Sequence, residues 1–333
     1  MVNQLAVMAI CVSLVGCTAL RLSSRGAPDE EMRGLELQLE AVDLPAAHGG
    51  QHPDPQVPKP LFTTIPVSGW LHGFDYRLLD AKGHSVPREV LHHFKVIAPE
   101  RRELFSPVVL HLAGAGNETM PVSLPRQVGY PLKAGDTLLV TAMLHNPTDR
   151  DLEGVRLQIT LNYSTRGSWR SPAPVVPFFT HVTPPMHEPS YDLPPGRSHK
   201  SLEIKPSVSG RILGLGGHLH RYGVLLRLED VTEGRVLWEQ EAVRSPDGTV
   251  LQVPHQTFVW SRGPKLRSDR TYRVTAFYDN PTGDTIRGGG MGTVGGVIET
   301  DDPWPEVDRQ AAEYIWYMKR EATSSRAPGH QHR

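Results

Sequence analysis

The chain has 333 residues, a formal net charge of −1 and 38% hydrophobic residues, which is enough for about two domains at ~150 residues each. Charges of both signs are mixed along it, so there is no basic field of the kind that attracts nucleic acid. The 31 glycines and 30 prolines are typical of β-rich domains with many turns. The composition therefore argues against nucleic acid as a partner and favours an all-β protein.

Both cysteines, Cys11 and Cys17, lie in the first twenty residues. The apolar run from Leu5 to Val15 has the length of a signal-peptide core and is too short to span a bilayer. It leads into Leu-Val-Gly-Cys, a tetrad similar to a bacterial lipobox, in which the peptide is cut before a cysteine that carries diacylglycerol. The lack of Lys or Arg before the run is atypical, and an apolar run that happens to contain a cysteine is the alternative. We predict a signal peptide over residues 1–17, lipidation of Cys17, and a lipid anchor in the cell envelope, on the outer membrane or cell surface, with a periplasmic face as the alternative.

Residues 18–58 show no hydrophobic period, so we predict a flexible tether between the lipid and the folded body. The proline-rich stretch from Ser171 to Pro174 is the expected change of domain. The predicted organisation is then a first domain over 59–172, a second over 173–322 and a disordered tail over 323–333.

Strands are the predicted elements from Leu61 onward. In the run from Val155 to Tyr163, apolar and polar residues alternate at every step, which places the apolar ones on one buried face. Turns with Pro-Gly, Glu-Gly and Asp-Gly, at Gly196, Gly234 and Gly248, separate the runs. Many short strands favour two tandem jelly-roll or β-sandwich domains over a βαβ sheet. Further strand runs are Thr137 to Leu144, Val224 to Leu228, Val236 to Trp238 and Thr271 to Tyr278.

The segment near the C-terminus departs from the strand pattern. A short helix is predicted from Pro305 to Arg320, with Asp302 before it. Its expected apolar stripe consists of Val307, Ala311, Tyr314, Ile315 and Met318.

A spaced histidine pair, His218 and His220, is the first candidate metal site. Residues two apart on a strand point the same way, so both can reach one ion; solvated surface histidines are the alternative. Met291 stands in a stretch of glycines that we expect to be a loop. Its thioether is a soft ligand that suits copper, especially Cu(I), better than zinc, magnesium or calcium. A lone methionine is often core filler, but one surrounded by glycines has little to pack against.

An adjacent pair, His92-His93, interrupts an apolar strand and is the second candidate site. Neighbouring residues on a regular strand face opposite sides, so both imidazoles can bind one ion only at a bulge or a strand end. His145 closes the predicted strand before it, and Asn146-Pro147 follows at once, which places the imidazole at a rim. A hydrogen-bonding residue at a strand end is the alternative interpretation of His145.

Taken in order, these elements resemble the copper type II, ascorbate-dependent monooxygenases, which include the peptidylglycine α-hydroxylating and dopamine β-monooxygenases. The resemblance implies two copper ions per chain, with ascorbate or a similar one-electron reductant as co-substrate. It implies hydroxylation of a C–H bond of a small organic substrate by O2. An electron-transfer copper would be held by His92, His93 and His145, and the catalytic copper by His218, His220 and Met291. The matching elements are His92-His93, His145, Pro194-Pro195-Gly196, His218-Leu219-His220 and Met291.

The chain also departs from this family. The animal enzymes have several disulfides, whereas the mature chain would keep Cys17 alone. The residues that hold the substrate in the peptidylglycine enzymes are replaced by Gly216, Thr293 and Gly295, so peptidylglycine is not the expected substrate. Arg221 and Tyr222 are candidates for contacts to a different substrate, with a plain surface role as the alternative.

Three functions are compatible with the sequence. The first is a lipid-anchored, monomeric copper monooxygenase, the second a copper-handling lipoprotein without turnover, and the third a structural or interaction protein on a decayed scaffold. Hydrolase and phosphate-binding motifs such as G-x-S-x-G and H-E-x-x-H are absent from the sequence. The remaining histidines are expected to be solvated or hydrogen-bonded, or to bind metal weakly near the ends: His72, His84, His111, His181, His187, His199 and His255, and then His48, His52, His330 and His332.

Overall fold

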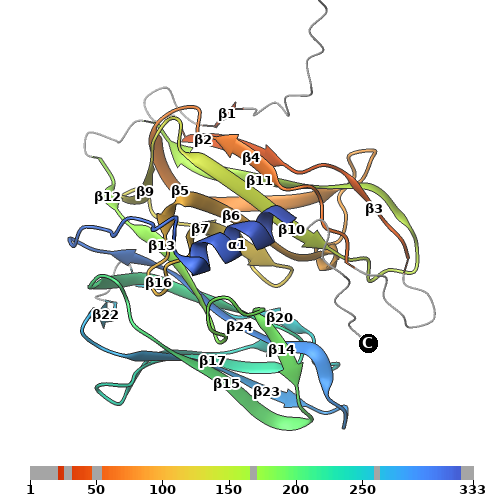
Figure 1. Cartoon of the computed structure of the whole chain (residues 1–333). Coiled ribbons are helices and arrows are strands. Elements are labelled where there is room, and N and C mark those ends of the chain that lie inside the picture. Colours follow the sequence, from red (N-terminus) through yellow and green to blue (C-terminus); the bar gives the residue numbers. More distant parts are fainter. Residues whose placement is uncertain (1–21, 26–31, 47–54, 166–170, 259–262, 324–333) are drawn as a thin grey trace, which may run out of the picture.

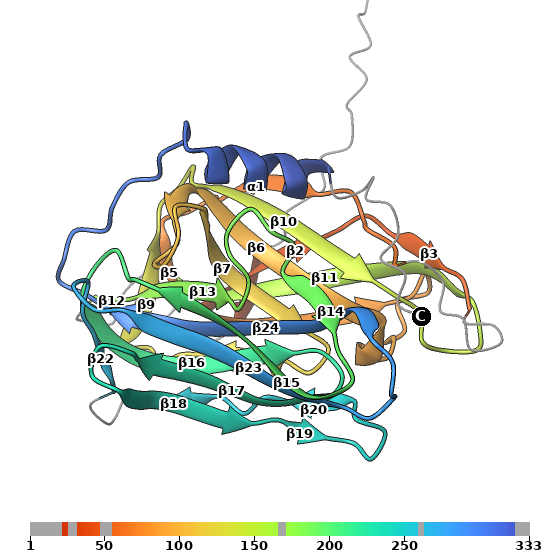
Figure 2. The same ribbon diagram turned by 60° about the horizontal axis from the view of Figure 1, so that its bottom comes forward.

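The computed structural model describes residues 22–25, 32–46, 55–165, 171–258 and 263–323. Nearly all regular structure in these ranges is β, arranged as two sandwiches, which confirms the predicted all-β class. Figure 1 shows the first sandwich above the second, and Figure 2 shows the second from below. The predicted signal peptide, Cys17 and all but residue 323 of the predicted tail lie outside the described residues. In the described part of the chain, no helix is long and apolar enough to cross a membrane.

The first sandwich has two sheets. Its strands are β1 (Leu22–Arg25), β2 (Met32–Gln38), β3 (Val42–Leu44), β4 (Leu61–Thr64), β5 (Gly69–Leu79), β6 (Leu91–Arg102), β7 (Val109–Gly116), β8 (Val122–Ser123), β9 (Val128–Leu132), β10 (Thr137–Leu144), β11 (Leu152–Ser164) and β12 (Ala173–Pro174), with a 3-10 turn at Arg88–Val90. One sheet has the order β1-β2-β11-β5-β9-β12, with β3 beside β11 and β8 beside β5, and the other has the order β4-β10-β6-β7.

The second sandwich repeats this two-sheet plan. Its strands are β13 (Val176–His181), β14 (Ser190–Leu193), β15 (Gly196–Ile204), β16 (Gly210–Leu219), β17 (Gly223–Asp230), β18 (Arg235–Glu241), β19 (Val243–Arg244), β20 (Val250–Gln252), β21 (Gln256–Thr257), β22 (Lys265–Leu266), β23 (Tyr272–Asn280) and β24 (Ile286–Glu299). The sheet β13-β24-β16-β21, with β14 and β22 at its sides, faces the first sandwich, and β15-β23-β17-β18 forms the far layer (Figure 1). Strands β19 and β20 form a separate hairpin.

Each sandwich has its own apolar core, which the alternation of its strands fills. On β11, Val155, Leu157, Ile159 and Leu161 are 0% exposed and Tyr163 is 1% exposed, so the predicted alternation is confirmed. The predicted glycine turns are also confirmed. Because Gly196, Gly234 and Gly248 have positive φ angles of 75°, 62° and 86°, a residue without a side chain suits these positions.

The prediction of a flexible tether over 18–58 is wrong for residues 32–46. Strand β2 pairs with β11 along seven residues, and Leu35, Leu37 and Leu44 are each 1% exposed. Leucines alternate here with glutamate and glutamine, which is a strand pattern with one buried face. This alternating pattern is short and lies in a polar, charged stretch, so it was not recognised as a strand. The first sandwich includes residues before the predicted boundary at 59.

The C-terminal helix starts later than predicted. Helix α1 spans Ala312–Thr323, because the chain before it runs extended along the first sandwich. There Glu306 forms a β-bridge with Arg101, and the indole of Trp304 donates to the carbonyl of Arg102 at 3.0 Å. The predicted stripe is right for Tyr314 and Met318, which pack against the buried cluster under the helix. It is wrong for Ile315, which is 51% exposed, and it missed Tyr317 and Glu321, which are buried.

Helix α1 packs on the face of the β4-β10-β6-β7 sheet that points away from the first core (Figure 2). Tyr317 packs there against Ile97 and Leu139. The second sandwich covers more of that face, because β13 packs against β7. His93 and Lys95 lie on the same face as Ile97, since residues two apart on a strand point the same way. The outer face of β6 is therefore closed in by α1 and by the second sandwich.

Candidate metal centre

The five histidines singled out in the sequence meet between the two sandwiches. His92 and His93 stand on β6 and His145 follows β10, whereas His218 and His220 stand at the end of β16 and directly after it. The ring centroids of His92 and His220 are 5.4 Å apart. The two predicted ligand sets therefore touch across the domain boundary, an arrangement that no local sequence pattern specifies.

A β-bulge allows both histidines of the adjacent pair to face one point. Met143 pairs with His93 and Leu144 pairs with Leu91, so His92 is the extra residue of a bulge on β6. As a result the Nδ1 atoms of His92 and His93 lie 2.8 Å apart. Two nitrogens that each bind one ion at ~2.0 Å and at a right angle lie about 2.8 Å apart. The His145 ring completes the group, with its centroid 5.9 Å from that of His92.

The spaced pair also converges, with the ring centroids of His218 and His220 5.2 Å apart. The Nδ1 of His218 lies 2.5 Å from a carboxylate oxygen of Glu118, so this nitrogen carries the proton and donates it. The Nε2 of His218 is buried and has no hydrogen-bond partner among the described residues. In the neutral ring, a proton on Nδ1 leaves the lone pair on Nε2, which is the arrangement of metal-binding histidines.

Glu118 comes from the loop after β7, in the other domain, and its side chain is 2% exposed. Burial alone would lower the pKa of His218, but the charge of Glu118 and its hydrogen bond outweigh that effect and raise the pKa. Thr119 donates a further hydrogen bond to the Glu118 carboxylate at 3.2 Å. The sequence analysis missed Glu118, because a single glutamate in a turn carries no periodic or motif signal.

Met291 lies within strand β24, so the prediction of a glycine-rich loop is wrong. It is 8% exposed and pairs with Ser190. The glycines around it permit close packing of the strand. A Cβ at Gly290 would lie 2.4 Å from the ring of Tyr191, and one at Gly292 would lie 2.5 Å from the methyl of Ala276. The glycine run is therefore part of a strand in which close packing leaves no room for side chains, and not a flexible loop.

A buried tyrosine fixes the chain on both sides of the second ligand set. The Tyr278 hydroxyl accepts from the backbone N–H of His220 at 3.1 Å and from that of Met291 at 2.9 Å. It also donates to the carbonyl of Met291. Burial raises the pKa of Tyr278, so the hydroxyl keeps its proton. Tyr278 ties two candidate ligands together although 71 residues of sequence separate them (291 minus 220); the sequence analysis read it only as the end of a strand.

Three other histidines have protein partners through their Nδ1 atoms. The Nδ1 of His72 is 2.9 Å from the carbonyl of Val128, that of His111 is 2.8 Å from Glu103, and that of His181 is 2.8 Å from the hydroxyl of Thr293. Burial, with the nearby charge of His111 second, lowers the pKa of His181 to about 3, so its ring is neutral.

The donor types in the cluster fit copper, since imidazole and thioether are ligands that it accepts. The histidines come together in pairs, His92 with His93 and His218 with His220. Within the ranges that the structure describes, no three His, Cys, Asp or Glu side chains already close on a single point as a complete metal site. The candidate donors are therefore of types that copper accepts, His145 lies next to the first pair, and Met291 lines the same cavity as His218.

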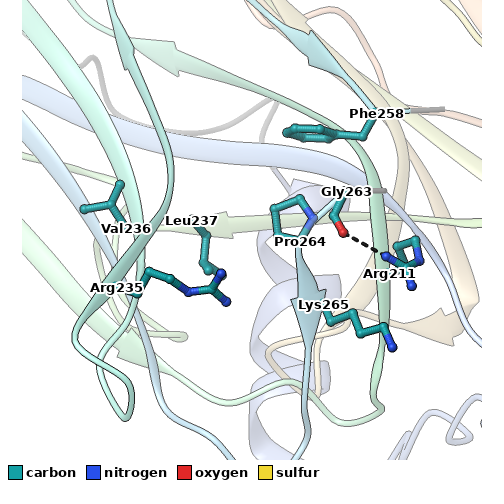
Figure 3. Close-up of a pocket in the computed structure, with 8 residues that line it drawn as sticks. All are labelled: Arg211, Arg235, Val236, Leu237, Phe258, Gly263, Pro264 and Lys265. Atoms are coloured by element: carbon teal, nitrogen blue, oxygen red, sulfur yellow. Dashed lines mark hydrogen bonds between the residues drawn. The ribbon is translucent and has the colours of Figure 1, made fainter. Parts of the chain in front are cut away.

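A cavity of about 240 Å³ opens between the sandwiches beside this cluster and reaches His93, His218 and Met291. A larger cavity of about 580 Å³ lies elsewhere in the second sandwich (Figure 3), where Arg211 donates to the carbonyl of Gly263 at 3.1 Å. None of the eight residues that line the larger cavity is a candidate ligand, so we place the chemistry in the smaller one.

No family model matches the chain. No curated protein matches it in a sequence comparison. Among solved structures, similar folds include a peptide-N(4)-(N-acetyl-β-D-glucosaminyl) asparagine amidase, at 10% identity and a TM-score of 0.41, covering 81% of this chain and 98% of that one. Another is PNGF-II, at 7% identity and a TM-score of 0.38, covering 80% and 66%. A fucolectin from striped bass follows at 10% identity and a TM-score of 0.19, covering 80% and 96%.

Proposed function

We propose that this protein is a copper-dependent monooxygenase that hydroxylates a C–H bond of a small organic substrate with O2 and a one-electron reductant such as ascorbate. The observation that carries the proposal is the convergence of five histidines from both domains on one region. Met291 lines the cavity that opens there. The resemblance to the copper type II, ascorbate-dependent monooxygenases predicts this same set of ligands in this order.

In this proposal the first copper is held by His92, His93 and His145, and the second by His218, His220 and Met291. Bound copper would supply electron transfer at the first site and oxygen activation at the second. The bulge at His92 aims both neighbouring imidazoles at one point, and the shared proton between their Nδ1 atoms must leave when a metal binds there. Glu118 accepts a hydrogen bond from Nδ1 of His218 and so leaves Nε2 as the nitrogen that could bind the copper.

Residues outside the two ligand sets position the ligands and form the walls of the cavity. Tyr278 fixes the backbone on which His220 and Met291 stand. The cavity brings a bound molecule beside His218 and Met291, while Phe94 and Phe179 form part of its walls. A substrate held there has its C–H bonds next to the second ligand set. The same proposal places the mature chain on a lipid at Cys17 in the cell envelope.

A second candidate is a copper-handling lipoprotein that binds copper without turnover. It is favoured by the positions at which the peptidylglycine enzymes hold their substrate, because Gly216, Thr293 and Gly295 here carry no charged group. The two candidates share the copper sites and differ in oxygen chemistry.

Copper content and oxygen uptake of the purified chain test both candidates together. We expect two copper ions per chain, with one lost in Met291→Ala and one lost in a His92→Ala/His93→Ala double variant. His199→Ala, at an exposed position on β15, is the matched control and should keep both. Ascorbate-driven oxygen uptake by the parent supports the monooxygenase, and copper without uptake supports copper handling. An absence of stoichiometric copper would overturn both.

A further inference from the structure

We propose that the cavity between the two sandwiches binds an uncharged, apolar molecule of about one substituted ring, and that this is the substrate class of the enzyme. This inference rests on the proposed function, because it identifies the substrate by its place beside the second ligand set. It is carried by the position, shape and charge of the cavity.

The position of the cavity links it to both ligand sets. Its walls come from β6 and β7 of the first sandwich and from β13, β16 and β24 of the second. His93 of the first set and His218 and Met291 of the second line it together. A molecule in this space therefore contacts residues of both sets at once.

The open volume is created by glycines on the strands that carry the ligands. Gly214 and Gly216 lie on the same face of β16 as His218, at two-residue steps, and Gly295 lies on the same face of β24 as Met291. All of these residues line the cavity. An added Cβ at Gly214 would meet only the carbonyl of Gln256 among nearby atoms, at 3.7 Å. Side chains are thus missing where the two sheets face each other, next to the ligands.

The lining offers few partners to a charged ligand. It includes no Asp, Glu or Arg, and Lys95 is its one lysine. That ammonium group is already 2.6 Å from the carboxylate of Glu321. The Nδ1 atoms of His111 and His181 are bonded to protein groups. Apolar side chains make up much of the remaining wall: Phe74, Phe94, Leu112, Phe179, Leu213 and Val253.

Burying an ion in such a wall costs more than burying a neutral molecule, because the wall has no carboxylate or guanidinium and its lysine is already paired; its other polar groups include the uncharged side chains of Gln252, Gln256 and Thr257. The volume also limits the ligand. An apolar cavity of about 150 Å³ is enough for benzene, so the 240 Å³ here accommodates a substituted ring. An aromatic or aliphatic hydrocarbon with a C–H bond near Met291 meets both conditions.

Binding of three probes of similar size tests the inference on the copper-free chain: ethylbenzene, benzoate and benzylammonium. Saturation-transfer NMR titrations should give a dissociation constant for ethylbenzene at least about tenfold below those of both ions. Gly214→Leu, which fills the cavity, should weaken ethylbenzene binding about tenfold or more, and Gly214→Ala should weaken it less. The unfolding temperature and copper content of each variant verify that the fold is kept.

Tighter binding of either ion would overturn the inference, and so would absence of ethylbenzene binding or its full retention in a folded Gly214→Leu variant. Because these titrations use no copper, their failure is separate from a failure of the copper sites. A chain that binds copper but not ethylbenzene keeps the proposed function and loses this substrate class.

Discussion

The two sandwiches share a short stretch of sequence, and they use it differently. Val140 to Thr148 and Val274 to Thr282 both read Val-Thr-Ala, three variable residues, and Asn-Pro-Thr. In each domain the stretch is the end of a strand, β10 or β23, followed by a turn. The sandwiches therefore contain the same structural unit on the second strand of a four-stranded sheet.

The asparagine of each unit builds the turn in the same way. The amide of Asn146 donates to the carbonyls of Leu44 and Arg150, at 2.9 and 2.8 Å. The amide of Asn280 donates to those of Pro194 and Asp284, at 3.1 and 2.8 Å. In both turns the asparagine oxygen accepts from the backbone N–H and the hydroxyl of the threonine two residues later.

The units differ in the residues just before the asparagine. The first domain has His145 there, and its sheet faces the other sandwich, so the imidazole reaches the histidine cluster, with its ring centroid 5.9 Å from that of His92. The second domain has Asp279, 48% exposed, because β23 belongs to the far sheet (Figure 1). That strand serves its site with the preceding residue, Tyr278, whose hydroxyl crosses the core to Met291. The sheet in which the unit lies thus decides which of its residues can serve the site.

The largest expected effect distinguishes His145 from Asp279. His145→Ala removes a third donor from the first ligand set and should abolish binding of one of the two copper ions. Asp279→Ala, the matched change in the other domain, should leave both bound. Copper per chain after dialysis, measured by atomic emission, checks this. Two copper ions in His145→Ala would show that this imidazole is only a hydrogen-bonding residue at a strand end.

The shared turns predict equal losses of stability. Asn146 and Asn280 are 2% and 1% exposed, and replacing either with alanine leaves buried carbonyls without donors, which should cost about 3 to 4 kcal/mol in the free energy of unfolding. Urea denaturation of Asn146→Ala and Asn280→Ala provides the measurement. Asp149→Ala, at an exposed turn position, is the control. A loss in one turn alone would show that the two turns are not equivalent.

Helix α1 packs on the first sandwich and should make that domain sensitive to acid. Burial would raise the pKa of Glu321, but the charge of Lys95 and its hydrogen bond outweigh it and lower the pKa from 4.5 to about 2. The folded-state pKa is thus below the unfolded one, so the stabilisation is fully present above about pH 4.5 and is lost as the pH falls toward 2.

The loss should amount to at most about 3.4 kcal/mol, from 1.36 kcal/mol for each of the 2.5 pKa units between 4.5 and about 2. The free energy of unfolding between pH 7 and pH 2.5, followed by tryptophan fluorescence, gives the measurement. In Glu321→Gln the carboxylate is gone, so this part of the pH dependence should disappear. An unchanged slope in that variant would show that Glu321 does not contribute.

The smallest expected effect concerns the dependence of the second site on the first domain. Glu118→Gln keeps an oxygen acceptor for His218 but removes the negative charge, which should weaken copper binding at the second set about 10- to 100-fold. Competition with a chelator measures both affinities in one titration, and the first set is the internal control. An equal loss at both sets would point to a change in the fold rather than in the His218 ring.

Local patterns predicted the elements whose signal is periodic. Alternation gave the strand from Val155 to Tyr163, and glycine turns gave the positive φ positions. The same logic failed where context outweighed pattern. The leucines of β2 stood in a charged stretch, the proline-containing segment before α1 runs along the first sandwich instead of forming a helix, and the glycines beside Met291 allow strands to pack closely.

Only some features of the candidate site could be predicted from the sequence. The requirement for a bulge at His92-His93 followed from strand geometry, and a bulge is present. Glu118 and Tyr278 were missed because they act over long range: Glu118 lies 100 residues before His218 in the chain, and Tyr278 reaches His220 from 58 residues away. The residues that flank Glu118 and Tyr278 in the sequence form no pattern that would predict these contacts.

The sequence by itself determined the β class and the kinds and order of the donor residues, because strand period and ligand chemistry are properties of the side chains and their spacing. The tertiary structure alone decided that the two histidine sets touch, which nitrogen of His218 binds Glu118, and that a largely apolar cavity opens beside Met291. These features depend on how two separate sheets pack face to face, and that packing is fixed by contacts between residues far apart in the chain.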